Sequence, residues 1–92
     1  MSRKLKAGII GATGMVGQRF VTLLDKHPYF DIALLAASGK SEGKTYGRAV
    51  EGRWAVGSKV PDSAAGMTVQ NAASVSAIAE QVDFIFCARR LF

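Results

Sequence analysis

The chain has 92 residues, of which 49% are hydrophobic and 21% are charged, and its formal net charge is +5. This length allows one small domain near the lower limit for a self-sufficient core, and the composition excludes a disordered or collagen-like chain. The single cysteine, Cys87, excludes a disulfide framework and a cysteine metal cluster, so we expect no metal and a reducing location, the cytoplasm.

The basic residues are scattered along the chain, and no long basic tract is present. We expect a solvated basic surface, with attraction to an anionic ligand such as a phosphate as the alternative. Nucleic acid is not an expected partner, because no stacking aromatic residues interleave with the basic ones. Neither a membrane span nor a secretory signal is expected, because the apolar segment after Lys6 is rich in glycine and is interrupted by Arg19.

The first elements are an apolar run at 4–12, typical of a parallel strand buried on both faces, and a segment at 13–27 with helical spacing. The spacing predicts an amphipathic helix whose inward face carries Val16, Phe20, Leu23 and Leu24. Pro28 should end this helix, which would place His27 at its C-terminus in a structural role.

The remaining elements alternate in the same way. We expect a second apolar strand at 31–38, a long connection at 39–66 with one short turn of helix, a weak strand at 67–70, a helix at 73–81 with Val75, Ile78 and Ala79 on one face, and an apolar strand at 82–88. A connection of this length usually has a function, and Trp54 within it is expected to cap the connection rather than touch a ligand. The order predicts an α/β fold, a partial Rossmann-like doubly wound parallel sheet with strand order 3-2-1-4, truncated.

Three glycines, Gly11, Gly14 and Gly17, stand three residues apart between the first strand and the first helix. Gly11 would permit a tight turn, Gly14 would let a pyrophosphate approach the backbone, and Gly17 would let the helix lie close to the strand. The unpaired amides of residues 13–16 and the helix dipole would attract negative charge, and Thr13 adds a hydroxyl. The pattern predicts a dinucleotide site; a plain turn with packing glycines is the alternative.

The end of the second strand indicates which dinucleotide is bound. NAD sites usually carry a carboxylate there, but this chain has Ser38, Lys40 and Ser41. Two hydroxyls and an ammonium can hold a 2′-phosphate, so we expect NADP rather than NAD. Glu42 is the contrary residue and is expected to point to solvent.

At these residues the chain resembles a known family. "KAGIIGATGMVGQRF" at 6–20, together with "LLAASGKSEGKTYG" at 34–47, is similar to the amino-terminal, NADP-binding part of aspartate-semialdehyde dehydrogenase, of the archaeal and fungal branch. The resemblance runs from about Lys6 to Ala88. It implies reductive dephosphorylation of aspartyl phosphate to aspartate semialdehyde with NADPH, a step in lysine, threonine and methionine biosynthesis, by a homo-oligomer.

The resemblance also implies roles for single positions. Thr13, Gly14, Met15 and Val16 would wrap the pyrophosphate. Ser38, Lys40 and Ser41 would meet the 2′-phosphate. Cys87 and Ala88 would lie near the adenosine side of the cofactor. Cys87 itself is expected to be a buried, inert packing residue.

The catalytic groups that the resemblance implies have no match in this chain, so we predict no catalytic residue within it. Residues 1–88 are predicted to form the N-terminal part of an NAD(P)-binding Rossmann domain, 89–92 a divergent tail, and the catalytic and dimerisation domain is absent. The tail suggests a truncated or frame-shifted product or a deliberately ended chain. We expect no dehydrogenase activity from the isolated chain.

Other functions stay open at this point. Acetylglutamyl-phosphate reductases and atypical short-chain dehydrogenases share Gly-Ala-Thr-Gly openings, although the segment Ser38 to Lys44 favours the semialdehyde enzyme. A non-catalytic NADP-binding module is a third possibility. It would leave the last strand as an exposed apolar edge, which invites aggregation.

Overall fold

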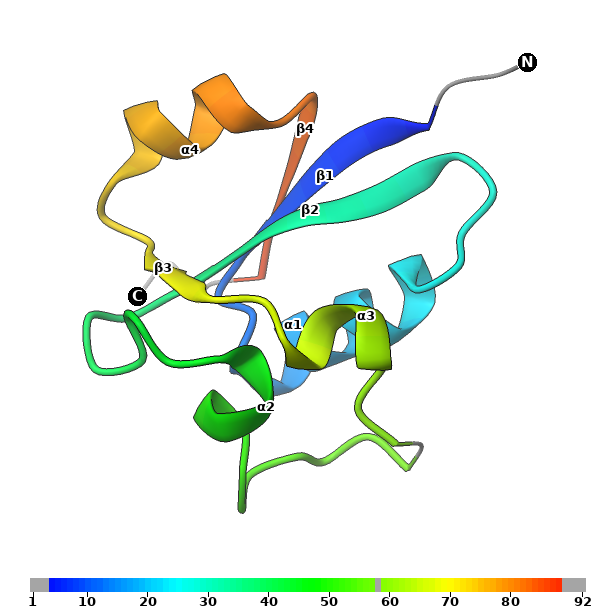
Figure 1. Cartoon of the computed structure of the whole chain (residues 1–92), viewed down its shortest axis with the longest axis vertical. Helices are drawn as coiled ribbons and strands as arrows, with labels where there is room; N and C mark the ends of the chain where they lie inside the picture. The colour runs from blue at the N-terminus through cyan, green and yellow to red at the C-terminus, as the bar shows by residue number, and fades with distance from the viewer. Residues whose placement is uncertain (1–3, 58, 89–92) are drawn as a thin grey trace.

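The structure is a computed structural model that describes residues 4–57 and 59–88 (Figure 1). Its four strands are β1 (Leu5–Ile10), β2 (Phe30–Ala37), β3 (Val69–Asn71) and β4 (Phe84–Cys87). All pair in parallel, in the order β3-β2-β1-β4, so the predicted fold class and strand order 3-2-1-4 are confirmed. The tail at 89–92 lies outside the described residues.

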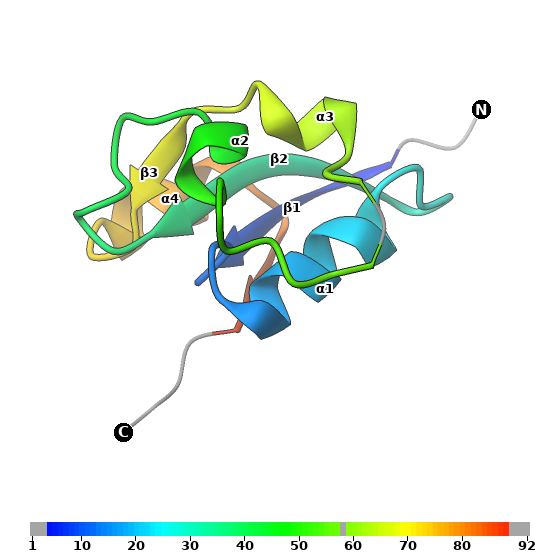
Figure 2. The ribbon, with the colours of Figure 1, turned by 90° about the horizontal axis from the view of Figure 1, so that it is seen from below.

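Four helices flank the sheet: α1 (Met15–Leu24), α2 (Tyr46–Ala49), α3 (Asp62–Ala65) and α4 (Val75–Gln81). Figure 1 shows α4 on one side of the sheet and the other three on the opposite side, and Figure 2 shows α1, α2 and α3 from below. The long connection therefore contains two four-residue helices rather than the single turn expected. Within the described part of the chain, none of the helices has the length and apolarity to cross a bilayer.

The core lies on both faces of the sheet, because successive strand residues point in opposite directions. Ile9, Leu35 and Val69 are buried on the face that carries α1. Leu34 and Ala36 are buried with Ile78 of α4 on the other face. Burial on both faces explains why the first two strands appear in the sequence as continuous apolar runs.

The inward face of α1 differs from the prediction. Val16 is 55% exposed and Leu23 is 69% exposed, whereas the buried positions of the helix are Gly17, Gln18, Val21 and Leu24. The reason is steric: the helix rests on the preceding turn through Gly17, and this contact turns the 17–21–24 side toward the sheet. Only Leu24 is fully buried as expected.

The end of α1 also differs. The helix stops at Leu24, three residues before His27, and Lys26 adopts a left-handed φ of 58°. The amide of His27 donates to the carbonyl of Leu24 at 3.1 Å, and its Nδ1 accepts from the amide of Tyr29 at 3.1 Å. His27 thus has a structural role, as predicted, but in the turn after the helix rather than in its last turn.

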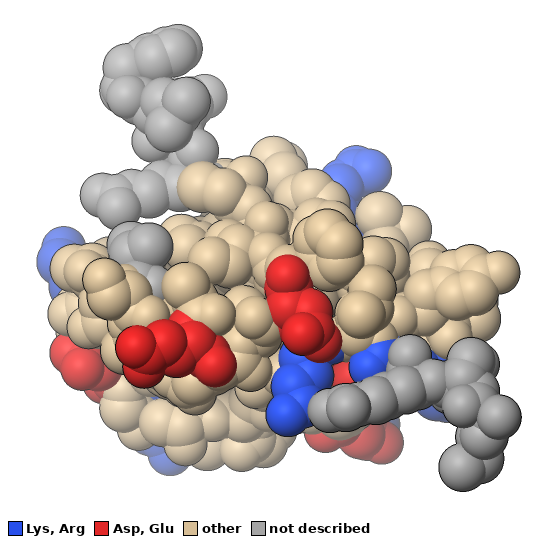
Figure 3. All heavy atoms as spheres, turned by 90° about the horizontal axis from the view of Figure 1, so that it is seen from above, with Lys and Arg blue, Asp and Glu red and all other residues tan. Residues whose placement is uncertain are grey.

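The strand β4 is the exposed edge that the sequence predicts. Among the described residues it pairs with β1 alone, and Phe84 is 50% exposed. The expectation that Cys87 is buried is wrong, because the edge position leaves its side chain exposed. Charged side chains on the face seen from above are interspersed among other residues and form no single basic patch (Figure 3).

Candidate functional site

The turn between β1 and α1 has the conformation that its first glycine allows. Gly11 has a φ of 82°, in the left-handed region that side chains rarely adopt. The amides of Gly11 and Ala12 both donate to the carbonyl of Ala36 in β2, at 2.9 and 3.0 Å. The turn is therefore held at the carboxyl edge of the sheet.

The other two glycines have different surroundings. A Cβ on Gly17 would lie 2.7 Å from the Cα of Ala12, and closer still to the carbonyl oxygen of Gly11, so the helix packs directly on the turn. A Cβ on Gly14 would meet only the Gly11 carbonyl oxygen, at 3.6 Å, which is ordinary contact. Packing therefore requires glycine at 17 but leaves position 14 open to the surface.

The amides at the start of α1 are largely free, as the prediction requires. No hydrogen-bond acceptor is found for the amides of Thr13, Met15 and Val16 among residues 4–57 and 59–88. Gly14 is the exception to the expected set of 13–16, because its amide closes the turn onto the carbonyl of Gly11 at 3.1 Å. The first turn of the helix carries no acidic residue, so its partial positive charge is not neutralised locally.

Two buried side chains hold the carbonyls of this turn. The hydroxyl of Tyr46 donates to the carbonyl of Ala12 at 2.7 Å, and Nε2 of Gln18 donates to the carbonyl of Thr13 at 2.9 Å. Gln18 also reaches the long connection, donating to the carbonyl of Arg53 at 3.1 Å and accepting from the amide of Ala55 at 2.8 Å. Burial raises the pKa of the Tyr46 phenol above its ordinary 10.0, so the hydroxyl stays protonated and able to donate to a higher pH than an exposed tyrosine.

A cavity of about 1000 Å³ opens at the carboxyl edge of the sheet. Of the residues expected to bind the cofactor, it is lined by Gly11, Thr13, Gly14, Met15, Val16 and Ser38. Cys87 and Ala88, expected near the adenosine side, line it as well. The first two strand ends and the end of β4 thus meet around one space, as ligand sites in open α/β sheets require.

Four further lining residues were not predicted: Gly39, Asn71, Ala72 and Ala73. A signal for Asn71 was present, because it is a polar residue at the carboxyl end of a parallel strand. The prediction missed Asn71 because this strand is short and weak, and it was expected to end at residue 70. Ala72 and Ala73 carry no chemical signal that sequence reasoning could use.

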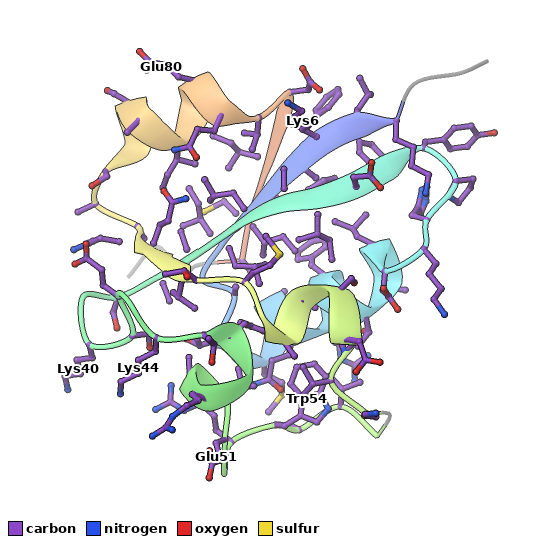
Figure 4. All side chains as sticks on the ribbon, in the orientation of Figure 1. Lys6, Lys40, Lys44, Glu51, Trp54 and Glu80 are labelled. Atoms are coloured by element: carbon purple, nitrogen blue, oxygen red, sulfur yellow. The ribbon has the colours of Figure 1, made fainter. Side chains whose placement is uncertain are left out.

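Lys40 and Ser41 do not line the cavity. Ser41 is only 7% exposed, and its amide donates to the carbonyl of Ser38 at 2.9 Å within a tight loop. Lys40 is exposed, and Figure 4 shows it extending from the loop to the same side as Lys44, away from the sheet. The loop is closed by a backbone bond from the Gly43 amide to the Val69 carbonyl at 2.9 Å.

Glu42 is exposed, as expected, but it has a specific partner. Its Oε1 accepts from Nδ2 of Asn71 at 3.2 Å, while Oδ1 of Asn71 accepts from the amide of Ala73 at 2.9 Å. A carboxylate is therefore held beside the same edge of the cavity as Ser38. Trp54, expected as a cap, is partly buried against the core and meets the Tyr46 ring edge-on at 6.2 Å between centroids.

A second cavity, of about 510 Å³, lies away from the glycine turn, among residues that include Lys4, Asp31, Lys59 and Asp62. Its charges are mixed: Lys4 pairs with Asp31 at 3.6 Å, and Lys59 pairs with Asp62 at 3.6 Å. No group of three or more His, Cys, Asp or Glu side chains suited to a metal ion is found in the described residues.

A parallel sheet whose first strand enters a helix through a glycine turn, with a cavity over the free amides, defines a dinucleotide-binding α/β unit. Residues 6–90 match the family described as semialdehyde dehydrogenase, NAD binding domain. The chain belongs to this family.

Known relatives agree with this assignment. The chain is 44% identical over 84 residues to aspartate-semialdehyde dehydrogenase of Methanothermobacter thermautotrophicus, covering 91% of this chain and 23% of the relative. It is 48% identical over 66 residues to the enzyme of the same name from Cryptococcus neoformans, covering 72% of this chain and 18% of the relative. The resemblance to the archaeal and fungal enzymes is confirmed.

A solved structure agrees as well. The crystal structure of aspartate-semialdehyde dehydrogenase with NADP from Candida albicans matches with a TM-score of 0.86 and 38% identity, over 96% of this chain and 24% of that one. The chain thus spans about a quarter or less of the length of these relatives.

Proposed function

We propose that the chain binds NADP as the cofactor-binding part of an aspartate-semialdehyde dehydrogenase. The observation that supports this most directly is the set of amides without an acceptor among the described residues, those of Thr13, Met15 and Val16, in residues that line the cavity together with Gly14. In this proposal the amides hold the pyrophosphate, together with Gly11 and Gly14. When bound in its reduced form, NADPH, the cofactor would supply the hydride for reduction of aspartyl phosphate to aspartate semialdehyde, leaving NADP⁺ and phosphate.

The preference for NADP over NAD rests on the loop after β2. Ser38 lines the cavity, Lys40 is exposed two residues later, and the end of β2 carries no carboxylate. In the structure Ser41 is buried and Lys40 extends away, so their contact with a 2′-phosphate requires the loop to adjust on binding. In this proposal the glycine turn receives the pyrophosphate in its present conformation, whereas the loop receives the 2′-phosphate only after a change of conformation.

A substitution at Gly14 tests the site without disturbing the fold. Gly14→Ala places a methyl group in the cavity lining, yet its nearest heavy atom within reach is 3.6 Å away and its φ of −78° suits alanine. We expect the variant to unfold at the wild-type urea concentration and to bind NADP⁺ at least about 10-fold more weakly, since a pyrophosphate needs backbone contact there. Gly66→Ala, which meets open space, is the control. Equal NADP⁺ affinity in Gly14→Ala and the wild type would contradict the proposed site.

The cofactor preference has its own test. Lys40→Gln should reduce the ratio of NADP⁺ to NAD⁺ affinity by about 5-fold, because a charge-assisted contact to the 2′-phosphate is lost. Lys59→Gln, a remote exposed lysine in an ion pair with Asp62, should leave the ratio unchanged. Isothermal titration with both dinucleotides measures it, and an unchanged ratio in Lys40→Gln removes Lys40 from the site.

The proposal extends to the longer enzyme that the relatives represent. There the activity belongs to amino-acid biosynthesis, to lysine, threonine and methionine, in the cytoplasm and in a homo-oligomer. The matching relatives support this enzyme over an acetylglutamyl-phosphate reductase or a short-chain dehydrogenase. The 92 residues alone should form no NADPH from aspartate semialdehyde, NADP⁺ and phosphate, and steady formation at 340 nm would refute that expectation.

A further inference from the structure

The turn between β1 and α1 is held by side chains that lie outside it. Two consecutive carbonyls, of Ala12 and Thr13, each accept a hydrogen bond from a buried side chain. Tyr46 is fully buried and Gln18 is 2% exposed, so neither bond competes with bulk water. Buried bonds of this kind fix a group more firmly than exposed ones, because breaking them leaves an unpaired polar atom.

Fixing these carbonyls fixes the amides as well. In a planar trans peptide, the carbonyl of one residue and the amide of the next point in opposite directions. The Tyr46 bond to the Ala12 carbonyl therefore orients the amide of Thr13, and Thr13 is one of the residues that line the cavity. The Gln18 bond to the Thr13 carbonyl orients the next peptide plane, whose amide closes the turn from Gly14 to Gly11.

The same two side chains join the turn to distant segments. Tyr46 begins α2, and its amide donates to the carbonyl of Met67 at 2.8 Å, next to β3. It lies at the end of the loop that contains Ser38 and Lys40, so one residue links the loop to the glycine turn. Gln18 links the turn to Arg53 and Ala55 in the long connection.

We infer that Gln18 and Tyr46 are positioning residues for the dinucleotide: they touch no ligand, and they hold the glycine turn in the shape that presents its amides. The inference rests on the proposed function, because it assigns these amides to the pyrophosphate. Their loss should weaken binding of the pyrophosphate part of the cofactor and leave binding of the 2′-phosphoadenosine part unchanged.

The test compares two ligands and two variants. Gln18→Met keeps the volume and removes all three hydrogen bonds, and Tyr46→Phe removes a single oxygen. Gln81→Met and Tyr29→Phe, on exposed residues, are the matched controls. Amide NMR titrations with NADP⁺ and with adenosine 2′-phosphate, which lacks the pyrophosphate, give both affinities and report the Thr13, Met15 and Val16 signals directly.

We expect NADP⁺ affinity to fall about 10-fold in Gln18→Met and about 5-fold in Tyr46→Phe, with adenosine 2′-phosphate affinity within about 2-fold of the wild type. Unchanged NADP⁺ affinity, or an equal loss for both ligands, overturns the inference. If Gln18→Met does not fold, Tyr46→Phe decides alone. A wild-type chain that binds adenosine 2′-phosphate but not NADP⁺ overturns the proposed pyrophosphate site itself, a different result from a defect confined to the variants.

Discussion

Replacement of Gly17 by alanine is the most direct test of how the turn and α1 fit together. The new Cβ would lie 2.7 Å from the Cα of Ala12, and the obstructing atoms are backbone, which cannot move aside as a flexible side chain can. Overpacking typically costs 1–3 kcal/mol, and this site belongs at the upper end, at about 3 kcal/mol. Alanine recovers about 1 kcal/mol of helix propensity, so we expect a net loss of about 2 kcal/mol.

Thermal and urea denaturation measure this loss. For a domain of this size, about 2 kcal/mol corresponds to a decrease in Tm of about 8–16 °C. Gly66→Ala is the control, because that glycine ends α3 with a φ of −88° and no atom lies within 4 Å of an added Cβ. The control should stay within about 0.5 kcal/mol of the wild type. If both variants unfold at the same urea concentration, the close approach of α1 to the turn does not determine the stability of this region.

Three further results are expected. Cys87 is exposed and lines the cavity, so it should react with a thiol reagent in the native chain, and saturating NADP⁺ should slow the reaction at least about 3-fold. Burial raises the pKa of Tyr46 from its ordinary 10.0; the unfolded chain therefore loses this proton first, and stability should fall by up to about 1.4 kcal/mol per pH unit above pH 10. In Tyr46→Phe, urea titrations at a series of pH values should show a shallower fall of stability with rising pH. An equal slope in the variant and the wild type would exclude Tyr46 as the source of this fall. Glu42→Gln should raise NADP⁺ affinity about 2-fold by calorimetry, because it removes a carboxylate from the edge near Ser38, and no change would place Glu42 away from the phosphate.

The sheet could be predicted because its signals are local and redundant. The runs around Ile9 and Leu35 are apolar on both faces, and each is followed by a turn or loop rich in glycine or serine. Alternation of such runs with helical segments leaves few topologies, and right-handed crossovers select the order found. The tight turn at Gly11 and the close packing at Gly17 could also be predicted from the sequence. Glycine adopts a positive φ without strain and has no Cβ to obstruct a close backbone contact.

The face of α1 could not be predicted from its apolar residues. The pattern assigned Val16 and Leu23 to the core, but the core positions nearest the turn belong to Gly17 and Gln18. Periodicity treats glycine as neutral and glutamine as polar, so it cannot detect a helix placed by a backbone contact or a buried amide with three partners. The exposure of Cys87 was missed although the predicted strand order placed its strand at the edge of the sheet, because the apolar composition of the strand was taken to indicate burial of every residue in it.

The residues that support the site lie far in the sequence from the residues proposed to contact the ligand, and the long connection shows why. Tyr46, the carbonyl of Arg53 and the amide of Ala55 all come from this segment, 34 to 37 residues from their partners in or beside the turn. The partners are backbone groups or one glutamine, so no pattern of paired residues marks them. A glycine turn alone provides free amides but not a fixed direction for them, because glycine is the most permissive residue. The direction comes from the buried bonds of Tyr46 and Gln18, and this supporting role gives a function to the part of the long connection between Tyr46 and Ala55.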